Sequence, residues 1–492
     1  MELRVGSGWS VVRGDPRGGV DSLAVAVGKE GVGWLRGLGL GVADRVFSAW
    51  SPEAGRSLVL YGAGPGLVAL GGAGGRGEWF GNAERLRVAV AAAVRAARES
   101  GAARRLGVLV EPGLLEAAGG SGWGELWALE QAMVAADMAN YVYSLRSRDA
   151  PRLLEEIVFD APREAVERAR AIGEAVRVAR DIANAPPSRM NPGGLEEAAR
   201  GLAERYGLSI RVLYRGELES LGMGGILAVG AGGGSEPRLI VLEYSGGPRK
   251  LAIVGKAVTF DAGGLDLKPP QYMLEMKFDK SGGAAAIGAV VAAAQLRLPF
   301  TVTALVPAVE NMPDGRSYKP LDVIEMYNGL RVEVGNTDAE GRLIMADALA
   351  YAAEKLKPDY MLDLATLTGA AVVALGNHAA ALMGNSEELL SRVEEAAWRA
   401  GEPCWRLPMW PVYEKQLESK VADTSNVGGR PAGAITAAKF LEKFVGDTRW
   451  AHLDIAGVAW VQEKGPQKPY YAHGATGWGV RTVVELLRGL SR

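Results

Sequence analysis

The sequence predicts an α/β fold with two domains: a smaller amino-terminal α/β domain and a larger carboxy-terminal domain with a mostly parallel central sheet covered by helices. Three observations lead to this prediction. The chain has 492 residues, which is more than one hydrophobic core needs. Short apolar segments with strand character alternate with segments of helical period. A charged helical segment followed by a proline-rich stretch interrupts this alternation between residues 163 and 194.

The amino-terminal domain is expected over residues 1–160. Strands are predicted at 56–62 and 104–112, and amphipathic helices at 84–100 and 125–145. Most charged residues of this domain fall on helix faces, so the sequence indicates no cluster of potential ligands here.

A connecting helix is expected over residues 161–183. Its charges are spaced four apart, as in Glu164 and Arg168, and such pairs stabilise one face of a helix. The prolines of 184–194 end this helix, and the larger domain is expected over 184–492.

The larger domain repeats the alternation of strand and helix. Its predicted strands are 237–244, 250–255, 301–309, 330–335 and 359–366, and its predicted helices are 281–296, 343–356 and 386–400. Because the strands are short, apolar and separated by helices, the sheet is expected to be mostly parallel and covered on both faces. Ligands of such sheets bind beyond the carboxyl ends of the strands.

The composition excludes several classes of function. A net charge of -2 argues against a nucleic-acid-binding protein, which needs a basic patch. The only cysteine, Cys404, rules out an intrachain disulfide framework and is expected to be a buried apolar residue. No signal peptide is visible, and the longest apolar run, 284–294, is too short to span a bilayer. We therefore expect a soluble, cytoplasmic protein without membrane contact.

Charged residues follow two of the predicted strands. Strand 250–255 is followed by a glycine-rich run that contains three of them, and a carboxylate stands at the entrance to helix 281–296. The segment "NTDAEGRL" (336–343) is expected to be a short loop from strand to helix with a charge at every second position. In chain order these residues are Lys256, Asp261, Lys268, Asp279, Asp338, Glu340 and Arg342.

Four of these residues are carboxylates, and their charges would repel one another if the loops converge. Two divalent cations would cancel them, and oxygen-rich ligand sets suit zinc, manganese or magnesium. Two bridged metals share and activate a water. The chain has 3 histidines and no H-E-x-x-H, so carboxylates must supply most ligands. Taken singly, Asp279 also fits a helix cap and Arg342 also fits a salt-bridged loop.

Several motifs resemble the leucine aminopeptidase (cytosol aminopeptidase) family. They are "VGKAVTFDAGGLDLKP", "MKFD", "ENMPDGRSYKPLDVI", "NTDAEGRL", "DLATLTGAAVVALG", "NVGGRPAGAITAAKFL" and "HLDIAG". The resemblance covers residues from about 180 to 492 in the family's order, and "NTDAEGRL" is the family's signature. It implies an aminopeptidase with two divalent metal ions per subunit, Mn²⁺ or Zn²⁺, with Co²⁺ or Mg²⁺ also compatible.

The resemblance also implies a role for each charged residue. Asp261 and Glu340 match the carboxylates that bridge both metals, Lys256 and Asp279 match ligands of the tighter site, and Asp338 matches a ligand of the more exchangeable site. Lys268 and Arg342 match the two catalytic residues, with Arg342 holding a bicarbonate ion. Lys256 must be neutral to bind a metal, which requires a strongly depressed pKa.

An apolar substrate pocket is implied by the same resemblance. Its residues would be Met276, Thr366, Leu367, Gly369, Ala456 and Ala459. The implied partners are peptide substrates and five further copies of the chain in a hexamer. The sequence departs from the common family pattern at Ala257, Ala262 and Lys280, none of which is a ligand position; Lys280 adds a positive charge beside Asp279.

Two alternatives compete with this interpretation. A two-metal phosphoesterase or nuclease also uses carboxylate-rich metal pairs, but it would require a basic substrate channel. A non-catalytic relative with a structural or regulatory role would be indicated by the loss of a ligand, and every motif position is filled.

Overall fold

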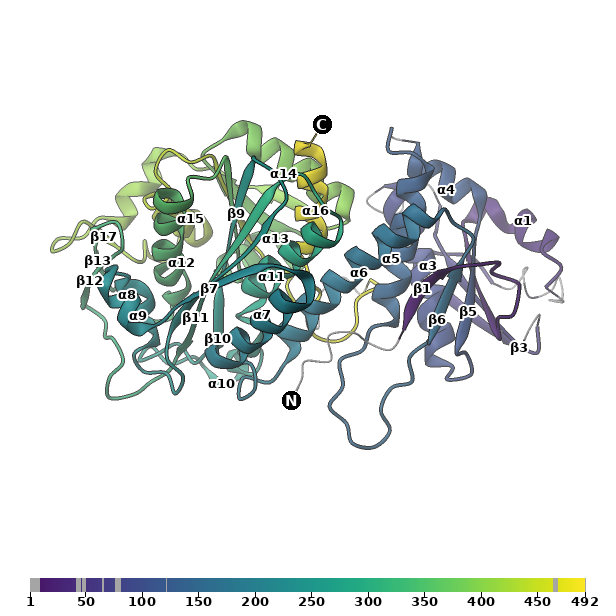
Figure 1. Ribbon diagram of the computed structural model, residues 1–492, viewed down its shortest axis with the longest axis horizontal. Coiled ribbons are helices and arrows are strands. Elements are labelled where there is room, and N and C mark those ends of the chain that lie inside the picture. The colour runs from purple at the N-terminus through teal and green to yellow at the C-terminus, as the bar shows by residue number, and fades with distance from the viewer. Residues whose placement is uncertain are drawn as a thin grey trace. The chain divides into compact units, whose positions relative to one another are not determined.

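A computed structural model describes residues 9–40, 46, 50–63, 66–75, 81–120, 122–462 and 468–491 (Figure 1). The chain forms two compact units. The amino-terminal unit comprises Glu2–Arg177 and Pro466–His473, and the carboxy-terminal unit comprises Val178–Gly465, Gly474–Arg492 and Met1. The domain boundaries expected near residues 160 and 184 stay a prediction.

The amino-terminal unit contains a six-stranded sheet in the order β1-β6-β5-β2-β4-β3. Its strands are β1 (Ser10–Arg13), β2 (Ser22–Val27), β3 (Ser57–Tyr61), β4 (Leu67–Gly72), β5 (Arg105–Val110) and β6 (Glu156–Phe159). Only the β3–β4 pair is antiparallel in this sheet. Its helices are α1 (Val32–Gly37), α3 (Asn82–Glu99), α4 (Pro112–Gly119) and α5 (Glu125–Asn140). The predicted helix 125–145 therefore ends five residues early.

Helix α6 (Arg163–Asn184) links the two units along the chain, and it carries the expected ion pair between Arg168 and Glu164 at 2.5 Å. It ends at Asn184, before the prolines. The next helix, α7 (Pro192–Tyr206), has Asn191 as its N-cap, and the Asn191 side chain accepts a hydrogen bond from Gly194 N. Among the described residues, no helix has the length and apolar character that crossing a membrane requires.

The carboxy-terminal unit is built on a nine-stranded sheet with the order β16-β15-β18-β14-β9-β11-β8-β7, and β10 pairs with β11. Its strands are β7 (Ser209–Leu213), β8 (Arg238–Ser245), β9 (Lys250–Gly255), β10 (Ala257–Asp261), β11 (Thr301–Asn311), β14 (Tyr360–Ala365), β15 (Ala380–Gly384), β16 (Cys404–Arg406) and β18 (Trp450–Asp454). The central strands β11, β9, β14 and β18 are parallel, and antiparallel pairs flank them. This arrangement confirms the expected mostly parallel sheet. A small sheet joins β12 (Val323–Glu325), β13 (Arg331–Glu333) and β17 (Thr424–Ser425).

Helices cover both faces of the large sheet. Helices α12 (Glu340–Tyr351) and α15 (Gly433–Glu442) lie on one face, and α11 (Ser281–Gln295) and α16 (Val480–Leu490) lie on the other (Figure 1). Shorter or peripheral helices are α8 (Arg215–Ser220), α9 (Gly224–Gly230), α10 (Pro270–Met273), α13 (Gly369–Leu375) and α14 (Glu387–Ala400). Because both faces are covered, the central strands are buried along nearly their whole length, as parallel strands require.

One predicted boundary is wrong in a way that matters for the site. The helix expected to start at residue 343 begins at Glu340, so Glu340 and Arg342 lie in its first turn rather than in a loop. Its last five predicted residues, Ala352–Leu356, form a π-helical turn. Gly341 lies inside this first turn, where a larger residue has no room, because a Cβ there would lie 2.5 Å from Lys256 Cε.

Candidate metal centre

The charged residues singled out above come from the ends of strands in the large sheet and from the segments before α11 and α12. Lys256 follows β9, Asp261 is the last residue of β10, and Asp338 stands two residues before the first residue of α12, which is Glu340. Asp279 lies between the short 3₁₀ helix Met276–Phe278 and α11. The edge of the sheet formed by the carboxyl ends of the strands therefore collects the ligand candidates, as expected for an open α/β sheet.

Three carboxylates converge at this edge. One oxygen each from Asp261, Asp338 and Glu340 lies within 4.8 Å of the others. Asp261 and Glu340 are buried, whereas the Asp338 side chain keeps 33% of its surface exposed. The cluster therefore has a buried side and a side that solvent reaches.

Lys256 lies on the buried side of the cluster. Its Nζ is 2.9 Å from Asp279 Oδ1 and 2.8 Å from Glu340 Oε1. It also donates a hydrogen bond to the carbonyl oxygen of Thr366 at 2.9 Å. The Thr366 hydroxyl in turn donates to Asp279 Oδ1 at 2.7 Å. Asp279 caps no helix, because α11 has Lys280 at its N-cap and no side-chain cap, so the capping alternative is wrong.

Lys268 lies on the exposed side. Its Nζ is 2.7 Å from Asp261 Oδ2 and also pairs with Asp338 Oδ1. The chain turns back to reach this position through Gly263 and Gly264, which have φ values of +91° and +67°. These left-handed conformations favour glycine, and they bring Lys268 N to hydrogen-bonding distance, 2.9 Å, from Ala262 O.

Asn311 supports the cluster although sequence reasoning gave it no role. Its amide nitrogen donates to Asp261 Oδ1 at 2.8 Å and to Thr337 O at 3.0 Å. Gly263 N donates to the same Asp261 oxygen at 2.9 Å. Asn311 is the last residue of β11, so the rule that pointed to the ends of parallel strands also applied to it.

Arg342 is buried in the first turn of α12, and its Nη1 donates to Asn426 O at 2.7 Å. Its Nε has no hydrogen-bond partner among the residues that the structure describes. Burial lowers the pKa of Arg342 to about 10, against the opposing effect of Glu340 and Asp454. The salt-bridge alternative is not what the structure shows, because Arg342 hydrogen-bonds a backbone carbonyl instead of a carboxylate.

Burial and neighbouring charge set the pKa values of the cluster. Burial raises the pKa of Asp338 to about 7, together with the charges of Asp261 and Glu340. Burial likewise raises the pKa of Asp279 well above its usual range. Burial acts to lower the pKa of Lys256, but Asp279, Glu340 and Asp261 outweigh it and the pKa is raised. This is opposite to the depressed pKa expected above, because the neighbouring carboxylates stabilise the ammonium form when no cation lies among them. The two lysines thus neutralise only part of the negative charge of the four carboxylates. A bound cation would neutralise the remainder and lower the repulsion between the carboxylates.

Lys280, the departure beside Asp279, is fully buried. Its Nζ donates to Ala185 O at 3.2 Å and to Lys277 O at 2.5 Å. Lys277 Nζ donates to Asn184 O at 3.3 Å. Both lysines thus donate to carbonyl groups at the carboxyl end of α6. Burial, together with the charge of Lys277, lowers the pKa of Lys280 to about 7, so the positive charge expected beside Asp279 is only partly present at neutral pH.

The residues expected to form a substrate pocket occupy three segments. Met276 begins the 3₁₀ helix before Asp279, while Ala456 and Ala459 follow β18. The segment after β14 contains Thr366 and Leu367, and Gly369 is the first residue of α13. Thr366 is tied to Asp279 and Lys256 as described, so this segment borders the metal centre directly.

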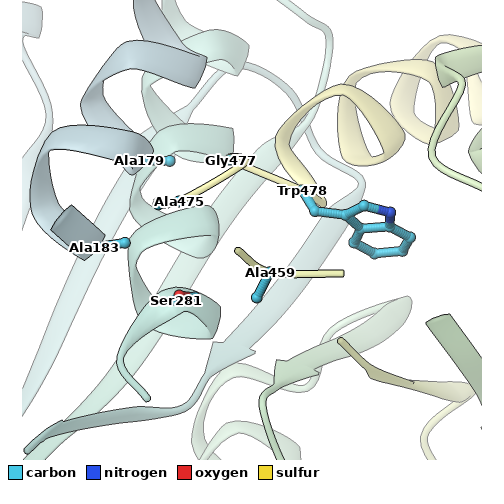
Figure 2. A pocket seen from close by; sticks show the side chains of 7 residues that line it. All are labelled: Ala179, Ala183, Ser281, Ala459, Ala475, Gly477 and Trp478. Carbon is cyan, nitrogen blue, oxygen red and sulfur yellow. The ribbon is translucent and has the colours of Figure 1, made fainter. Parts of the chain in front are cut away.

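Ala459 also lines a separate cavity of about 10 Å³, which has room for at most one water molecule (Figure 2). The other lining residues are Ala179, Ala183, Ser281, Ala475, Gly477 and Trp478. A leucine side chain does not fit this cavity, so the assignment of Ala459 to a substrate pocket stays a prediction.

The residues present fit a metal centre. Four carboxylates, three of them buried, lie beside two lysines and form a donor set of oxygen and amine nitrogen. Asp279 Oδ2 is buried and has no hydrogen-bond partner among the described residues, as expected of an oxygen reserved for a cation. Asp261, Asp279, Asp338, Glu340 and Lys256 in its neutral form would hold such ions.

Comparison with known proteins agrees with this geometry. Residues 177–484 match the family described as "Cytosol aminopeptidase family, catalytic domain". The probable cytosol aminopeptidase of Geobacter sp. (strain M21) is 44% identical over 418 residues, 82% of each chain. That of Chlorobaculum tepidum is 49% identical over 354 residues, 70% of this chain and 69% of the relative.

Among solved structures, the bottromycin maturation enzyme BotP in complex with Mn has a TM-score of 0.84 and 35% identity. The match covers 96% of this chain and 100% of the BotP chain. The family match spans the strand ends that carry the carboxylate cluster. The chain therefore belongs to the cytosol aminopeptidase family and is a metal-dependent aminopeptidase.

Proposed function

We propose that the protein releases leucine and other apolar residues from the amino termini of peptides, using two divalent ions per subunit, Mn²⁺ or Zn²⁺. The observation that supports this most directly is the convergence of Asp261, Asp338 and Glu340 within 4.8 Å, with a buried lysine on one side and a less buried lysine on the other. Co²⁺ and Mg²⁺ suit the same oxygen donors.

We assign the ligands by their contacts. Asp261 and Glu340, which match the family's shared ligands, would help to hold both ions. Lys256 and Asp279, which contact each other at 2.9 Å, would complete the buried site. Asp338, the most exposed carboxylate, would complete the second site, where a substrate amine has access. When bound, such ions act as Lewis acids and activate a water near neutral pH.

The protein side chains have distinct tasks in peptide hydrolysis. The Lys268 side chain keeps 13% of its surface exposed, and its Nζ contacts both Asp261 and Asp338. It can therefore donate a hydrogen bond to the oxyanion that develops on the peptide carbonyl. Asp338 would complete the more exchangeable ion site, and this site would receive the free α-amine of the substrate, which accounts for the release of amino-terminal residues only.

Arg342 is proposed to hold a bicarbonate ion, which would supply a proton acceptor beside the metal centre. Its buried Nε without a partner among the described residues supports an anion there, because an unsatisfied guanidinium N–H is costly to bury. No other group in the first turn of α12 offers a cationic donor.

The preference for leucine rests on the small side chains around the centre. Thr366, Gly369 and Ala456 have small side chains, and Leu367 and Met276 are half-buried apolar residues that suit an apolar substrate side chain. We propose that these residues, with Ala459, form the pocket for the first residue of the peptide.

We propose that the chain assembles into a homohexamer in the cytoplasm. Exposed apolar side chains, among them Trp405, Trp410 and Val412 near the edge strand β16, support self-association. The names of the relatives support the compartment. Sedimentation velocity of the purified protein tests the assembly, and a species with the mass of one chain contradicts it.

The function is tested by hydrolysis of leucyl-p-nitroanilide after removal of metal with a chelator and return of manganese, zinc, cobalt or magnesium. We expect activity to disappear on chelation, to return with metal, and to be absent with N-acetyl-leucyl-p-nitroanilide. Absence of activity with every metal, in protein shown to be folded and assembled, overturns the proposal. A comparison of leucyl, methionyl, alanyl and lysyl anilides tests the apolar preference.

A further inference from the structure

Asp454, the last residue of β18, hydrogen-bonds two chain segments beside the metal centre. Its Oδ1 accepts from Leu367 N and from Ala456 N, both at 3.1 Å. Its Oδ2 accepts from the Thr368 hydroxyl at 2.7 Å. The side chain is buried, with 1% of the residue exposed. One carboxylate therefore satisfies three donors from the segments that follow β14 and β18.

The segment held by Asp454 also contacts the metal ligands. Thr366 accepts from Lys256 Nζ with its carbonyl and donates to Asp279 with its hydroxyl. The next two residues donate to Asp454. The Thr368 hydroxyl also accepts from Ala371 N at 3.1 Å and so caps the start of α13. The segment 366–368 is therefore held at one end by the metal centre and at the other by Asp454.

We propose that Asp454 is a positioning residue, which fixes segment 366–368 and Ala456 against the metal centre and thereby sets the affinity and selectivity for the first residue of the peptide. The inference rests on the proposed function, because it takes Leu367 and Ala456 as part of the substrate pocket. Asp454 is not a catalytic residue in this proposal, since it acts only through the backbone that it holds.

The pattern of acceptors gives a sharp test by substitution. Both backbone N–H groups donate to the same oxygen, Oδ1. In Asp454→Asn the amide oxygen can still accept the hydrogen bonds from Leu367 N and Ala456 N. The amide nitrogen then faces the Thr368 hydroxyl oxygen, which can accept a hydrogen bond from it. In Asp454→Ala three buried donors lose their acceptor. The amide variant thus preserves most of the positioning without the charge, and the alanine variant removes it.

A matched control is available in the same unit. Asp347 is fully buried and accepts hydrogen bonds from Ile226 N and Tyr327 N, both at 2.9 Å. These partners belong to α9 and to the turn before β13, not to the segments around the metal centre. Asp347→Ala therefore removes a buried carboxylate with two backbone donors, and it is expected to lower stability while leaving substrate affinity unchanged.

The experiment compares the full-length protein and the three variants, loaded with the same metal, on leucyl and alanyl p-nitroanilide. For Asp454→Ala we expect a roughly tenfold to hundredfold loss of kcat/KM on the leucyl substrate, mainly through KM, because displaced binding groups cost this much. The preference for leucine over alanine is expected to fall with it. Asp454→Asn is expected to recover most of the loss, and Asp347→Ala to show only a lower Tm.

Hydrogen exchange gives a measurement that does not depend on activity. Faster exchange of the Leu367 and Ala456 amides in Asp454→Ala, but not in Asp454→Asn, supports the proposal. Unchanged KM and selectivity in Asp454→Ala overturn it, as does an amide variant as impaired as the alanine variant. If Asp454→Ala does not fold, Thr368→Val and Thr368→Ser replace it, and equal KM values for these two overturn the proposal. An inactive wild-type protein overturns the proposed function. An active wild type with unchanged KM and selectivity in Asp454→Ala overturns only the positioning role of Asp454.

Discussion

At the scale of single residues, the two lysines of the metal centre differ in what surrounds them. Lys256 has three acceptors, two carboxylates and the Thr366 carbonyl, and it is buried. Lys268 pairs only with carboxylates and retains some exposure. A ligand must be enclosed and fixed, whereas a group that stabilises substrate must be reachable, so the surroundings match the proposed roles.

Gly341 gives a test of how closely Lys256 is held. A Cβ at this position would lie 2.5 Å from Lys256 Cε and 2.7 Å from its Nζ. Because the clash falls on the end of a flexible side chain, Gly341→Ala is expected to move Lys256 without unfolding α12. We expect kcat/KM on leucyl-p-nitroanilide to fall about hundredfold, with a Tm close to that of the wild type.

The control for this prediction is Gly201→Ala, at a position in α7 where a Cβ meets nothing within 4 Å. It is expected to raise stability by roughly 0.5–1 kcal/mol and to leave activity unchanged. Kinetics and thermal unfolding of both variants check the prediction. Wild-type activity in Gly341→Ala would show that Lys256 tolerates displacement and would argue against its role as a ligand.

At the scale of elements, the centre depends on how the strand ends are tied to one another. Asn311 at the end of β11 donates to Asp261 at the end of β10 and to Thr337 in the loop before α12. Asp454 at the end of β18 ties the segment after β14 in the same way. The ligands are thus oriented by polar side chains that stand one strand away, which is how partners outside the ligand set tune a metal site.

Asn311→Ala removes one of these ties. Asp261 Oδ1 then keeps only Gly263 N as a donor, so the orientation of the bridging carboxylate is less fixed. We expect metal affinity to fall by about tenfold to hundredfold, measured by titration of the chelated protein with Mn²⁺. Asn385→Ala, which removes bonds to Thr448 O and Trp450 N away from the strand ends that form the centre, should leave metal affinity unchanged.

Elements and ligand positions were predictable from the sequence to different degrees. Four strands of the large sheet, β8, β9, β11 and β14, follow from apolar period, and Lys256 and Asp261 follow from the rule for parallel sheets. The strand expected at 330–335 lies instead in the small sheet as β13, and the edge strands and β18 were not predicted. The start of α12 was placed three residues too late, because Glu340, Gly341 and Arg342 were interpreted as part of the charged loop. Asp454 and Asn311 were missed because their roles depend on which strands are neighbours, and order in a sheet is not encoded locally.

At the scale of the whole molecule, the amino-terminal unit is discontinuous in sequence. It includes Pro466–His473, a return from the far end of the chain. Lys468 Nζ lies 2.9 Å from Glu84 Oε1, and the Tyr470 hydroxyl donates to the same oxygen at 2.5 Å. Glu84 on α3 is buried, and Arg87 Nη1 approaches its other oxygen at 3.2 Å. The unit is therefore complete only when nearly the whole chain is present.

A fragment of residues 1–177 tests this dependence. It retains Glu84 and Arg87 but lacks Lys468 and Tyr470, so a buried carboxylate loses two partners, which costs about 3–5 kcal/mol. We expect the fragment to unfold at a much lower temperature than the same fragment joined to residues 466–473 by a flexible linker. Circular dichroism during heating measures both. Equal transition temperatures would show that the returning segment adds nothing to the stability of this unit.

The same cluster predicts how the stability of the amino-terminal unit depends on pH. Burial raises the pKa of Glu84, but Lys468 and Arg87 outweigh burial and lower the pKa from 4.5 to about 2. Because the folded-state pKa is depressed, the ionised carboxylate stabilises the fold fully above pH 4.5, and this stabilisation is lost as the pH falls towards 2. The difference in pKa corresponds to about 3 kcal/mol.

Glu84→Gln tests this linkage, because glutamine does not titrate. Hydrogen exchange of the α3 amides, corrected for the intrinsic rate at each pH, gives the free energy of opening for each protein. The difference in this free energy between wild type and variant should become smaller by about 3 kcal/mol when the pH is lowered from 6 to 2. Glu99→Gln on the same helix is the control, since the Glu99 carboxylate is exposed and its pairs with Arg95 and Arg98 are expected to contribute little. Loss of metal in acid affects all three proteins alike. A difference that stays constant with pH would mean that Glu84 is held by shape and hydrogen bonds, with no contribution from its charge.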